Sequence, residues 1–142
     1  MTKEYQTNLS NAAIAQNALE RVCSGRCLAE ASQYYSPVFI DHVNGERLVG
    51  FAGIEQSVAL YKRFINGLAI TVQDQLTEGD RVMCRFVVAG FVYGRKVSID
   101  GITVSRIENE RIVEDWSVTD TASLLRQIGV WRALWIALRN SK

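Results

Sequence analysis

Asp120 stands at the end of a strand-like segment in which apolar and polar residues alternate. If the segment is one strand, Ile112, Glu114, Trp116, Val118 and Asp120 share a face. A carboxyl group beside an indole and aliphatic side chains loses hydration, which raises its pKa and suits it to general acid/base chemistry near neutrality. The spacing therefore predicts Asp120 as a proton carrier.

The same residue also fits a purely structural role. Asp120 precedes Thr121 and Ser123, and it could cap a short helical turn that runs through Leu125. Spacing alone leaves both interpretations open.

Two other candidates, Asp41 and His42, are neighbours in a short strand. They must point to opposite faces, so only one of them can enter a given cavity. His42 is the only histidine, and it could be a proton relay or a hydrogen-bonded structural residue. Arg85 and Asp100 are further polar candidates that could pair across strands.

Composition limits the number of domains, the partners and the cellular location that can be expected. The 142 residues contain one proline and no linker-like stretch, which predicts a single domain over residues 1–142. Sixteen basic and fifteen acidic residues nearly balance, so nucleic acid is not an expected partner. The first sixteen residues lack a signal-peptide pattern, and no apolar run would span a bilayer, so we expect a soluble cytoplasmic protein.

The cysteine and histidine content argues against a metal site. Cys23, Cys27 and Cys84 are an odd number, which favours reduced, mostly buried thiols over a disulfide framework. With one histidine and no second cysteine pair, the sequence predicts neither a zinc site nor any other metal or cofactor.

Helical periodicity dominates the first half of the chain. A first helix is expected between an N-cap at Ser10 and a stop at Gly25. A second, over residues 26–35, should end before Pro37, and a short strand should cover residues 38–43. A third helix, over residues 51–64, should end at Asn66-Gly67.

The second half of the chain alternates with a period of two. Strands are expected over residues 68–77, 81–93, 96–108 and 111–119, with tight turns at Glu78-Gly79-Asp80 and Asn109-Glu110. Three helices followed by such a meander predict an α+β fold. In that fold the helices pack against a strongly curved, mainly antiparallel sheet that forms a cone with an apolar internal cavity.

An ordered set of short motifs carries a family resemblance. The motifs are Asp41-His42, Gly50-x-x-Gly53-Ile54, Glu78-Gly79-Asp80-Arg81-Val82, Gly101-Ile102, Arg106-Ile107, Ile112-Val113-Glu114-x-Trp116, and Asp120 through Gln127-x-Gly129. Together they resemble the SnoaL-like polyketide cyclases of the nuclear-transport-factor-two-like superfamily, from about Ser10 to Gly129. The resemblance bears on the fold more directly than on the reaction.

The resemblance implies a function. In such cyclases the aspartate at the position of Asp120 moves protons during an intramolecular aldol closure, without metal or organic cofactor. The substrate implied is a hydrophobic, polyketide-like carbonyl compound, and isomerisation is a related outcome of the same proton transfer. Candidate substrate contacts are Tyr34, Phe39, Tyr61, Phe64, Trp116 and Val118, with the polar candidates Arg85 and Asp100.

Relatives in the superfamily suggest alternatives. A steroid-isomerase-type enzyme would use Asp41 as its base, but Ala18 and Thr103 occupy the places where its oxyanion donors would be expected. A limonene-epoxide-hydrolase-type enzyme needs acidic residues where this chain has Val87 and Val118. The third alternative is a binding or dimerisation domain without catalysis.

The C-terminal extension, residues 130–142, carries an apolar helical stripe. Its members are Val130, Trp131, Leu134, Trp135 and Leu138. The stripe could cover the cavity, pack on a second subunit or lie on a membrane, and packing within the protein is the default expectation. Together with the exposed outer sheet face that this fold should have, it predicts a homodimer.

Overall fold

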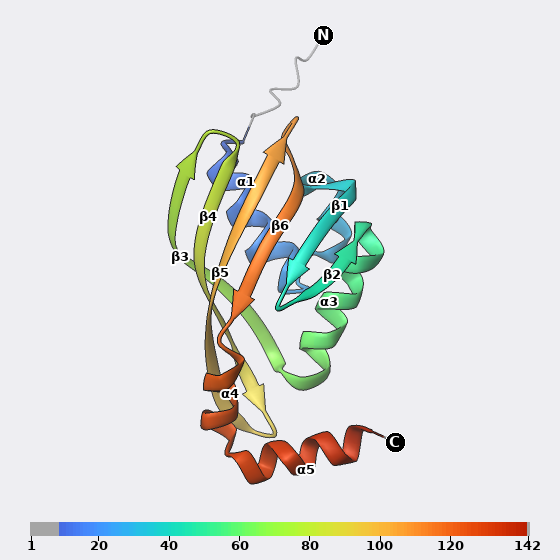
Figure 1. Cartoon of the computed structure of the whole chain (residues 1–142), viewed down its shortest axis with the longest axis vertical. Helices are drawn as coiled ribbons and strands as arrows, with labels where there is room; N and C mark the ends of the chain where they lie inside the picture. The colour runs from blue at the N-terminus through green and yellow to red at the C-terminus, as the bar shows by residue number, and fades with distance from the viewer. Residues whose placement is uncertain (1–8, 142) are drawn as a thin grey trace.

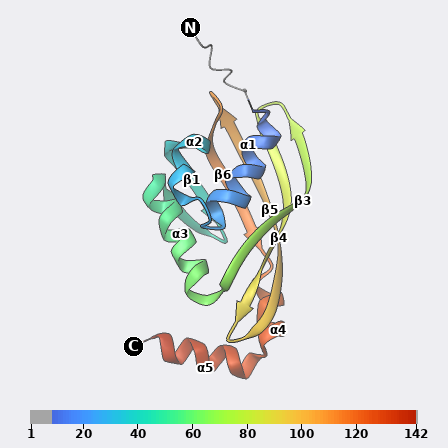
Figure 2. The same ribbon diagram turned by 180° about the vertical axis from the view of Figure 1, so that it is seen from behind.

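The computed structural model describes residues 9–141 and has the predicted α+β architecture. One six-stranded sheet has the order β2-β1-β6-β5-β4-β3. The strands are β1 (Tyr35–Val43), β2 (Glu46–Val49), β3 (Asn66–Glu78), β4 (Arg81–Val92), β5 (Arg95–Glu108) and β6 (Arg111–Thr119). The helices are α1 (Asn11–Asn17), α2 (Ala31–Tyr34), α3 (Gly50–Phe64), α4 (Thr121–Ile128) and α5 (Val130–Asn140). Figure 1 views the strands from the face without helices, and Figure 2 shows α1, α2 and α3 covering the other face.

The tight turns of the long strands follow the predicted pattern. Gly79 and Asp80 join β3 to β4, and Asn109 and Glu110 join β5 to β6. Both residues of the second turn have positive φ, 49° and 60°, which is the conformation that a two-residue hairpin with right-handed strand twist needs. These two hairpins are confirmed.

The first helix begins as predicted but changes its winding. The Ser10 side chain caps α1 by accepting a hydrogen bond from the Ala13 amide at 3.1 Å. After Asn17 the chain continues as a π-helix, η1 (Ala18–Cys23), and turns at Gly25 with φ of 73°.

The second helix is shorter than predicted. A 3-10 turn, η2 (Leu28–Glu30), leads into the single turn of α2, and β1 already starts at Tyr35. Pro37 therefore lies inside a strand. It falls between Tyr35 and Ile40, where the pairing of β1 with β6 is irregular. Proline has no backbone N–H group, and at this irregularity none is needed for the ladder.

The sequence analysis did not predict strand β2. β2 pairs antiparallel with β1 across an Asn44-Gly45 turn. β1 in turn pairs parallel with β6, which closes the order of the sheet and places Asp41 opposite Asp115.

The core lies between the helices and the concave sheet face. Gly101 illustrates how tightly this face is filled, because a Cβ atom there would lie 2.4 Å from the ring of Phe86 on β4. A side chain at Gly101 would therefore displace the Phe86 ring, which lines a cavity on this face.

The C-terminal helix departs from the expected packing. In α5 the buried residue is Ile136, whereas the predicted stripe is exposed, with Trp131 at 85% of its full accessibility. Trp135 has one aromatic neighbour, Tyr93, in an edge-on arrangement. Figure 1 shows α5 lying across the end of the molecule beyond α4, away from the main helical layer. No helix in residues 9–141 is long and apolar enough to cross a membrane.

Candidate active site

A bulge in β6 determines which of its side chains face the cavity. Ile107 pairs with Ile112 but Arg106 pairs with Glu114, so Val113 is an extra residue and reverses the alternation. Ile112 and Asp115 are buried, whereas Glu114 and Trp116 lie with Arg106 on the helix-free face. The regular alternation assumed from the sequence is therefore wrong between Ile112 and Glu114.

Two carboxyl groups come together on the concave face. Asp41 of β1 and Asp115 of β6 are partners in the parallel ladder, and both line a cavity of about 60 Å³. Most of the cavity wall is apolar, including Leu19, Phe39, Ile54, Val58, Phe86 and Val88. The cavity thus holds two acids in surroundings that solvate charge poorly.

Asp115 is the more deeply buried acid, with 6% of its surface accessible. Burial raises its pKa from an ordinary 3.8 to about 8, the nearby Ser105 hydroxyl opposes this rise, and the charge of Asp41 adds to it. One carboxyl oxygen, Oδ1, has no hydrogen-bond partner among the described residues. At neutral pH Asp115 is therefore a protonated acid with an unused polar atom.

Asp41 is the more acidic member of the pair. Burial raises its pKa to about 6, and the positive potential of the neighbouring His42 opposes the rise. Its Oδ1 also lacks a partner among the described residues. Near pH 7 the pair therefore holds one carboxylate and one carboxylic acid, the two forms that proton transfer requires.

A thiol and a phenol also line the cavity. The Cys23 sulfur lies 3.1 Å from the Tyr35 hydroxyl, and both residues line the cavity with the two acids. Burial raises the pKa of Cys23 to about 12 and that of Tyr35 well above its ordinary value. Both groups therefore remain protonated at neutral pH and can act only as hydrogen-bond donors or acceptors there.

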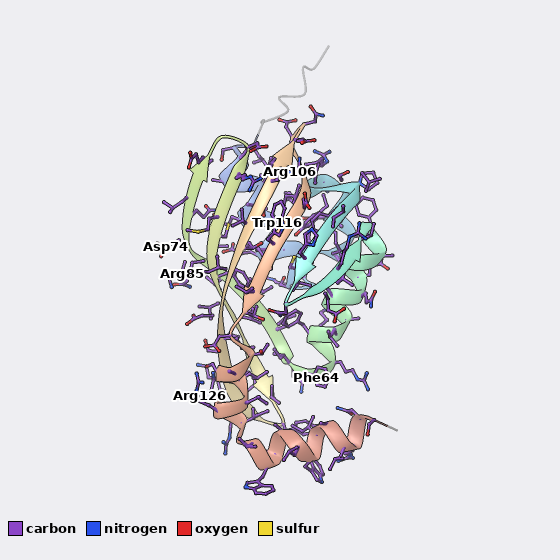
Figure 3. All side chains as sticks on the ribbon, viewed as in Figure 1. Phe64, Asp74, Arg85, Arg106, Trp116 and Arg126 are labelled. Atoms are coloured by element: carbon purple, nitrogen blue, oxygen red, sulfur yellow. The ribbon has the colours of Figure 1, made fainter. Side chains whose placement is uncertain are left out.

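The opposite face of the same strands holds a different arrangement. His42 Nε2 lies 2.9 Å from Glu114 Oε1, and Arg106 Nη2 donates to Glu114 Oε2 at 3.2 Å. The His42 ring stacks on Trp116 with 5.7 Å between centroids, and Arg81 lies over the same indole. Figure 3 shows Arg106 and Trp116 on this helix-free face. His42 is thus held by Glu114 and Trp116 on the face opposite to the cavity.

Comparison with known proteins gives the family. The family model of the SnoaL-like polyketide cyclases matches residues 13–128. The chain belongs to the SnoaL-like polyketide cyclase family. Among curated proteins, none matches the sequence significantly.

Solved structures show the same fold for this SnoaL-like chain. IdmH from Streptomyces antibioticus, a candidate polyketide cyclase, has a TM-score of 0.76 at 21% identity, covering 85% of this chain and 99% of its own. A candidate polyketide cyclase from Bacillus cereus also has a TM-score of 0.76 at 21% identity, covering 91% and 85%. A protein with a ketosteroid-isomerase-like fold from Catenulispora acidiphila, in complex with trimethylamine, has a TM-score of 0.69 at 21% identity and covers 80% and 90%.

Asp120, the acid/base residue that the SnoaL-like motif implied, caps a helix in this structure. Its Oδ1 accepts a hydrogen bond from the Ser123 amide at 3.0 Å, and Oδ2 lies 3.8 Å from Arg126 Nη2. The side chain is about half exposed, and Asp120 is not among the described residues that line the Asp41–Asp115 cavity. The structure thus contains the cap that the sequence left open, and a catalytic role for Asp120 stays a prediction.

The predicted substrate contacts of the SnoaL-like chain divide between several places. Phe39 and Tyr61 line the inner cavity, and Phe64 lines a neighbouring groove. Tyr34 is buried in the core but lines neither space. Val118 is an exposed residue of β6 on the side of Trp116, outside both.

The predicted pairing of Arg85 with Asp100 is wrong. Arg85 donates two hydrogen bonds to Asp74 Oδ2 instead, at 2.9 and 2.6 Å, because these residues are register partners of β4 and β3. Figure 3 shows this pair at the edge of the sheet. Asp100 lies opposite Val87, and its backbone carbonyl accepts the Asp120 amide.

Sequence reasoning missed Asp115 and Cys23 as cavity residues. No motif marks Asp115, because its placement follows from the bulge at Val113 and from the parallel pairing of β1 with β6. Cys23 reaches the cavity from the end of the π-helix η1. Within residues 9–141 no three His, Cys, Asp or Glu side chains gather as metal ligands would. Independence from metals and cofactors stays a prediction.

Proposed function

We propose that this SnoaL-like protein catalyses cofactor-independent proton transfer on a hydrophobic carbonyl compound, with Asp41 as base and Asp115 as acid. The observation that carries the proposal is the pairing of two buried carboxyl groups, opposite each other on neighbouring strands, in one apolar cavity. The pKa of about 6 leaves Asp41 mostly ionised at neutral pH, whereas the pKa of about 8 leaves Asp115 mostly protonated.

The proposed reaction begins at a carbon next to the substrate carbonyl. The Asp41 carboxylate removes a proton from that carbon while Asp115 donates a hydrogen bond, and then its proton, to the carbonyl oxygen. The electron pair of the broken C–H bond becomes the enol double bond. Burial of both acids strengthens these interactions, because little water screens them.

The enol has two outcomes. In isomerisation, protonated Asp41 returns its proton to a different carbon and Asp115 recovers its proton from the enol oxygen. In aldol closure, the enol carbon attacks a second carbonyl of the same molecule and its C=O π electrons move to the oxygen. The new alkoxide takes the proton of Asp41, and the Asp115 carboxylate recovers its proton from the enol oxygen as the first carbonyl re-forms. Both sequences return the two acids to their starting protonation states.

An exchange reaction tests the proposal without knowledge of the natural substrate. Acetyl-dimethylaminonaphthalene is a neutral, apolar ketone whose acetyl protons are the kind that Asp41 would remove. In heavy water, the protein should accelerate deuterium uptake into the acetyl group, as measured by mass spectrometry. The rate should rise with pH near 6, as Asp41 ionises, and fall near 8, as Asp115 loses its proton. Acceleration that is independent of pH over this interval would contradict the assignment.

A further inference from the structure

The cavity that Asp41 and Asp115 line is much too small for a drug-sized molecule. Its volume of about 60 Å³ accommodates a few water molecules or a small substituent, whereas ligand pockets usually measure about 300–1,000 Å³. A polycyclic compound cannot fit beside Asp41 and Asp115 in this conformation. Most of any such substrate must therefore lie elsewhere.

A second, larger space adjoins the cavity. A groove of about 440 Å³ lies between α3, the β1–β2 turn and α4, and most of its lining is apolar, with Leu48, Leu60, Phe64 and Leu124 among its residues. Val43, Ser57 and Tyr61 line both the groove and the inner cavity. The two spaces therefore adjoin at these three shared residues.

A short chain of hydrogen bonds lies where the two spaces adjoin. The Tyr61 hydroxyl lies 3.4 Å from Thr119 Oγ1, and Asn44 Nδ2 donates to the same oxygen at 2.9 Å. Thr119 lines the cavity, Asn44 lines the groove and Tyr61 lines both. The Tyr61–Thr119 contact is long for an O–H···O bond, so rotating the phenol away breaks only a weak interaction.

The charges along the two spaces are all of one sign. Asp41 lines the cavity as a carboxylate and Glu46 lines the groove, Asp115 is uncharged at neutral pH, and none of the described lining residues is a lysine or arginine. A carboxylate or phosphate on the ligand would meet negative charge without a cationic partner. The lining therefore disfavours anionic ligands.

We infer that the groove is a second substrate-binding compartment that takes an elongated, uncharged, apolar carbonyl compound. The carbonyl end passes the throat formed by Tyr61, Thr119 and Asn44 and reaches the two acids, while the rest of the molecule lies on Leu60 and Phe64. This inference rests on the proposed function for the orientation of the substrate, but the groove itself can be tested by binding alone.

Fluorescence titration with acetyl-dimethylaminonaphthalene tests the groove. Leu60→Glu places a charge on an exposed groove residue and should weaken binding about tenfold or more, the effect expected when one leucine contact is lost. Leu76→Glu is the matched control, because Leu76 is an exposed leucine of β3 outside the groove, and binding should not change. Equal affinities of the two variants would overturn the inference.

Charge selection and the throat have their own readouts. Dimethylamino-naphthoate, the acid analogue, should bind more weakly than the ketone. Glu46→Gln should reduce the difference in affinity between the acid and the ketone.

The throat is tested by the rate of association. Tyr61→Phe keeps the ring but removes the hydroxyl, so stopped-flow association of the ketone should accelerate about two- to tenfold, equivalent to one weak hydrogen bond. Preference for the acid, or unchanged association, would contradict the corresponding part of the inference.

The two proposals fail separately. If Asp41→Asn leaves deuterium exchange unchanged while Leu60→Glu still weakens ketone binding, the groove stands and the proposed reaction is wrong. If exchange depends on Asp41 but Leu60→Glu binds the ketone normally, the reaction stands and the groove does not hold the substrate.

Discussion

Glu114 and Asp115 are consecutive acids on one strand, yet they lie in opposite chemical environments. Glu114 faces His42 and Arg106 on the helix-free side, and these partners hold its pKa below the ordinary value. Asp115 faces the apolar cavity, where burial raises its pKa to about 8. The strand backbone sets this difference, because neighbouring side chains leave the sheet on opposite faces.

The same contrast recurs on β1 between His42 and Asp41. His42 is bonded and stacked on the helix-free face, while Asp41 lies in the cavity with one oxygen unpaired among the described residues. Satisfied polar groups on one face and unsatisfied acids on the other are what a structural network and a reactive site would respectively require. We therefore expect substitutions of adjacent residues to have very different effects.

The largest expected effect is on the rate of proton transfer. Asp41→Asn keeps the shape of the side chain but removes the base, so ketone deuterium exchange should fall about 10²–10⁴-fold. Glu114→Gln is the matched control on the outer face and should leave the rate within about twofold of the parent. If both variants lose similar activity, the distinction between the two faces is wrong.

The second expected effect is on the pH dependence of stability. The folded chain keeps a proton on Asp115 up to about pH 8, whereas the unfolded chain releases it near the ordinary value of 3.8. The folded state thus binds more protons in this interval, and the free energy of unfolding should fall as pH rises through it.

Asp115→Asn isolates that contribution. Chemical denaturation above pH 8 should show the variant more stable than the parent by on the order of 5 kcal/mol, with no such gain below pH 4. A parent whose stability rises steadily from pH 4 to pH 8, or a variant that is no more stable at high pH, would show that burial does not raise the pKa of Asp115.

The third prediction concerns the apolar surfaces outside the cavity. Val118 on the helix-free sheet face and Trp131 on α5 are exposed, and large apolar patches seldom remain in water. We expect a homodimer, with a dissociation constant in about the micromolar range or below. Truncation after Gly129 should weaken the dimer if α5 joins the interface. Sedimentation of a monomer alone at micromolar concentration would contradict the prediction.

The smallest expected effect is at Asp120. As a helix cap it should tolerate Asp120→Asn in both rate and stability, whereas Asp120→Ala should lower the free energy of unfolding by about 0.5–2 kcal/mol. A large loss of exchange rate in Asp120→Asn with unchanged melting temperature would instead restore the catalytic role that the family motif implied.

Much of the fold could be predicted because its signals are local. The Ser10 cap, the Asn109-Glu110 turn and the two-residue period of the long strands each act within a few residues. The site depended on long-range features. Parallel pairing of β1 with β6 joins segments about seventy residues apart in sequence, and an extra residue at Val113 reverses every later side chain of β6.

That reversal accounts for the main difference between the predicted and proposed sites. The alternation through Glu114, Trp116 and Val118 is real, but it lies on the helix-free face, and β6 ends at Thr119 before it reaches Asp120. Asp115 therefore occupies the apolar surroundings that the desolvation argument had given to Asp120. The physical reasoning about a carboxyl in apolar surroundings carries over to Asp115 without change.

Direct titration of the carboxyl groups tests the central claim without any substrate. Carbon-13 NMR of the aspartate and glutamate carboxyl carbons, assigned with Asp41→Asn, Asp115→Asn and Glu114→Gln, would follow each acid through pH. We predict a midpoint near 6 for Asp41, a midpoint near 8 for Asp115 and a midpoint below 4.5 for Glu114. Midpoints near 4 for both Asp41 and Asp115 would contradict the account, because neither acid would then be held in the protonation state that the proposed chemistry needs.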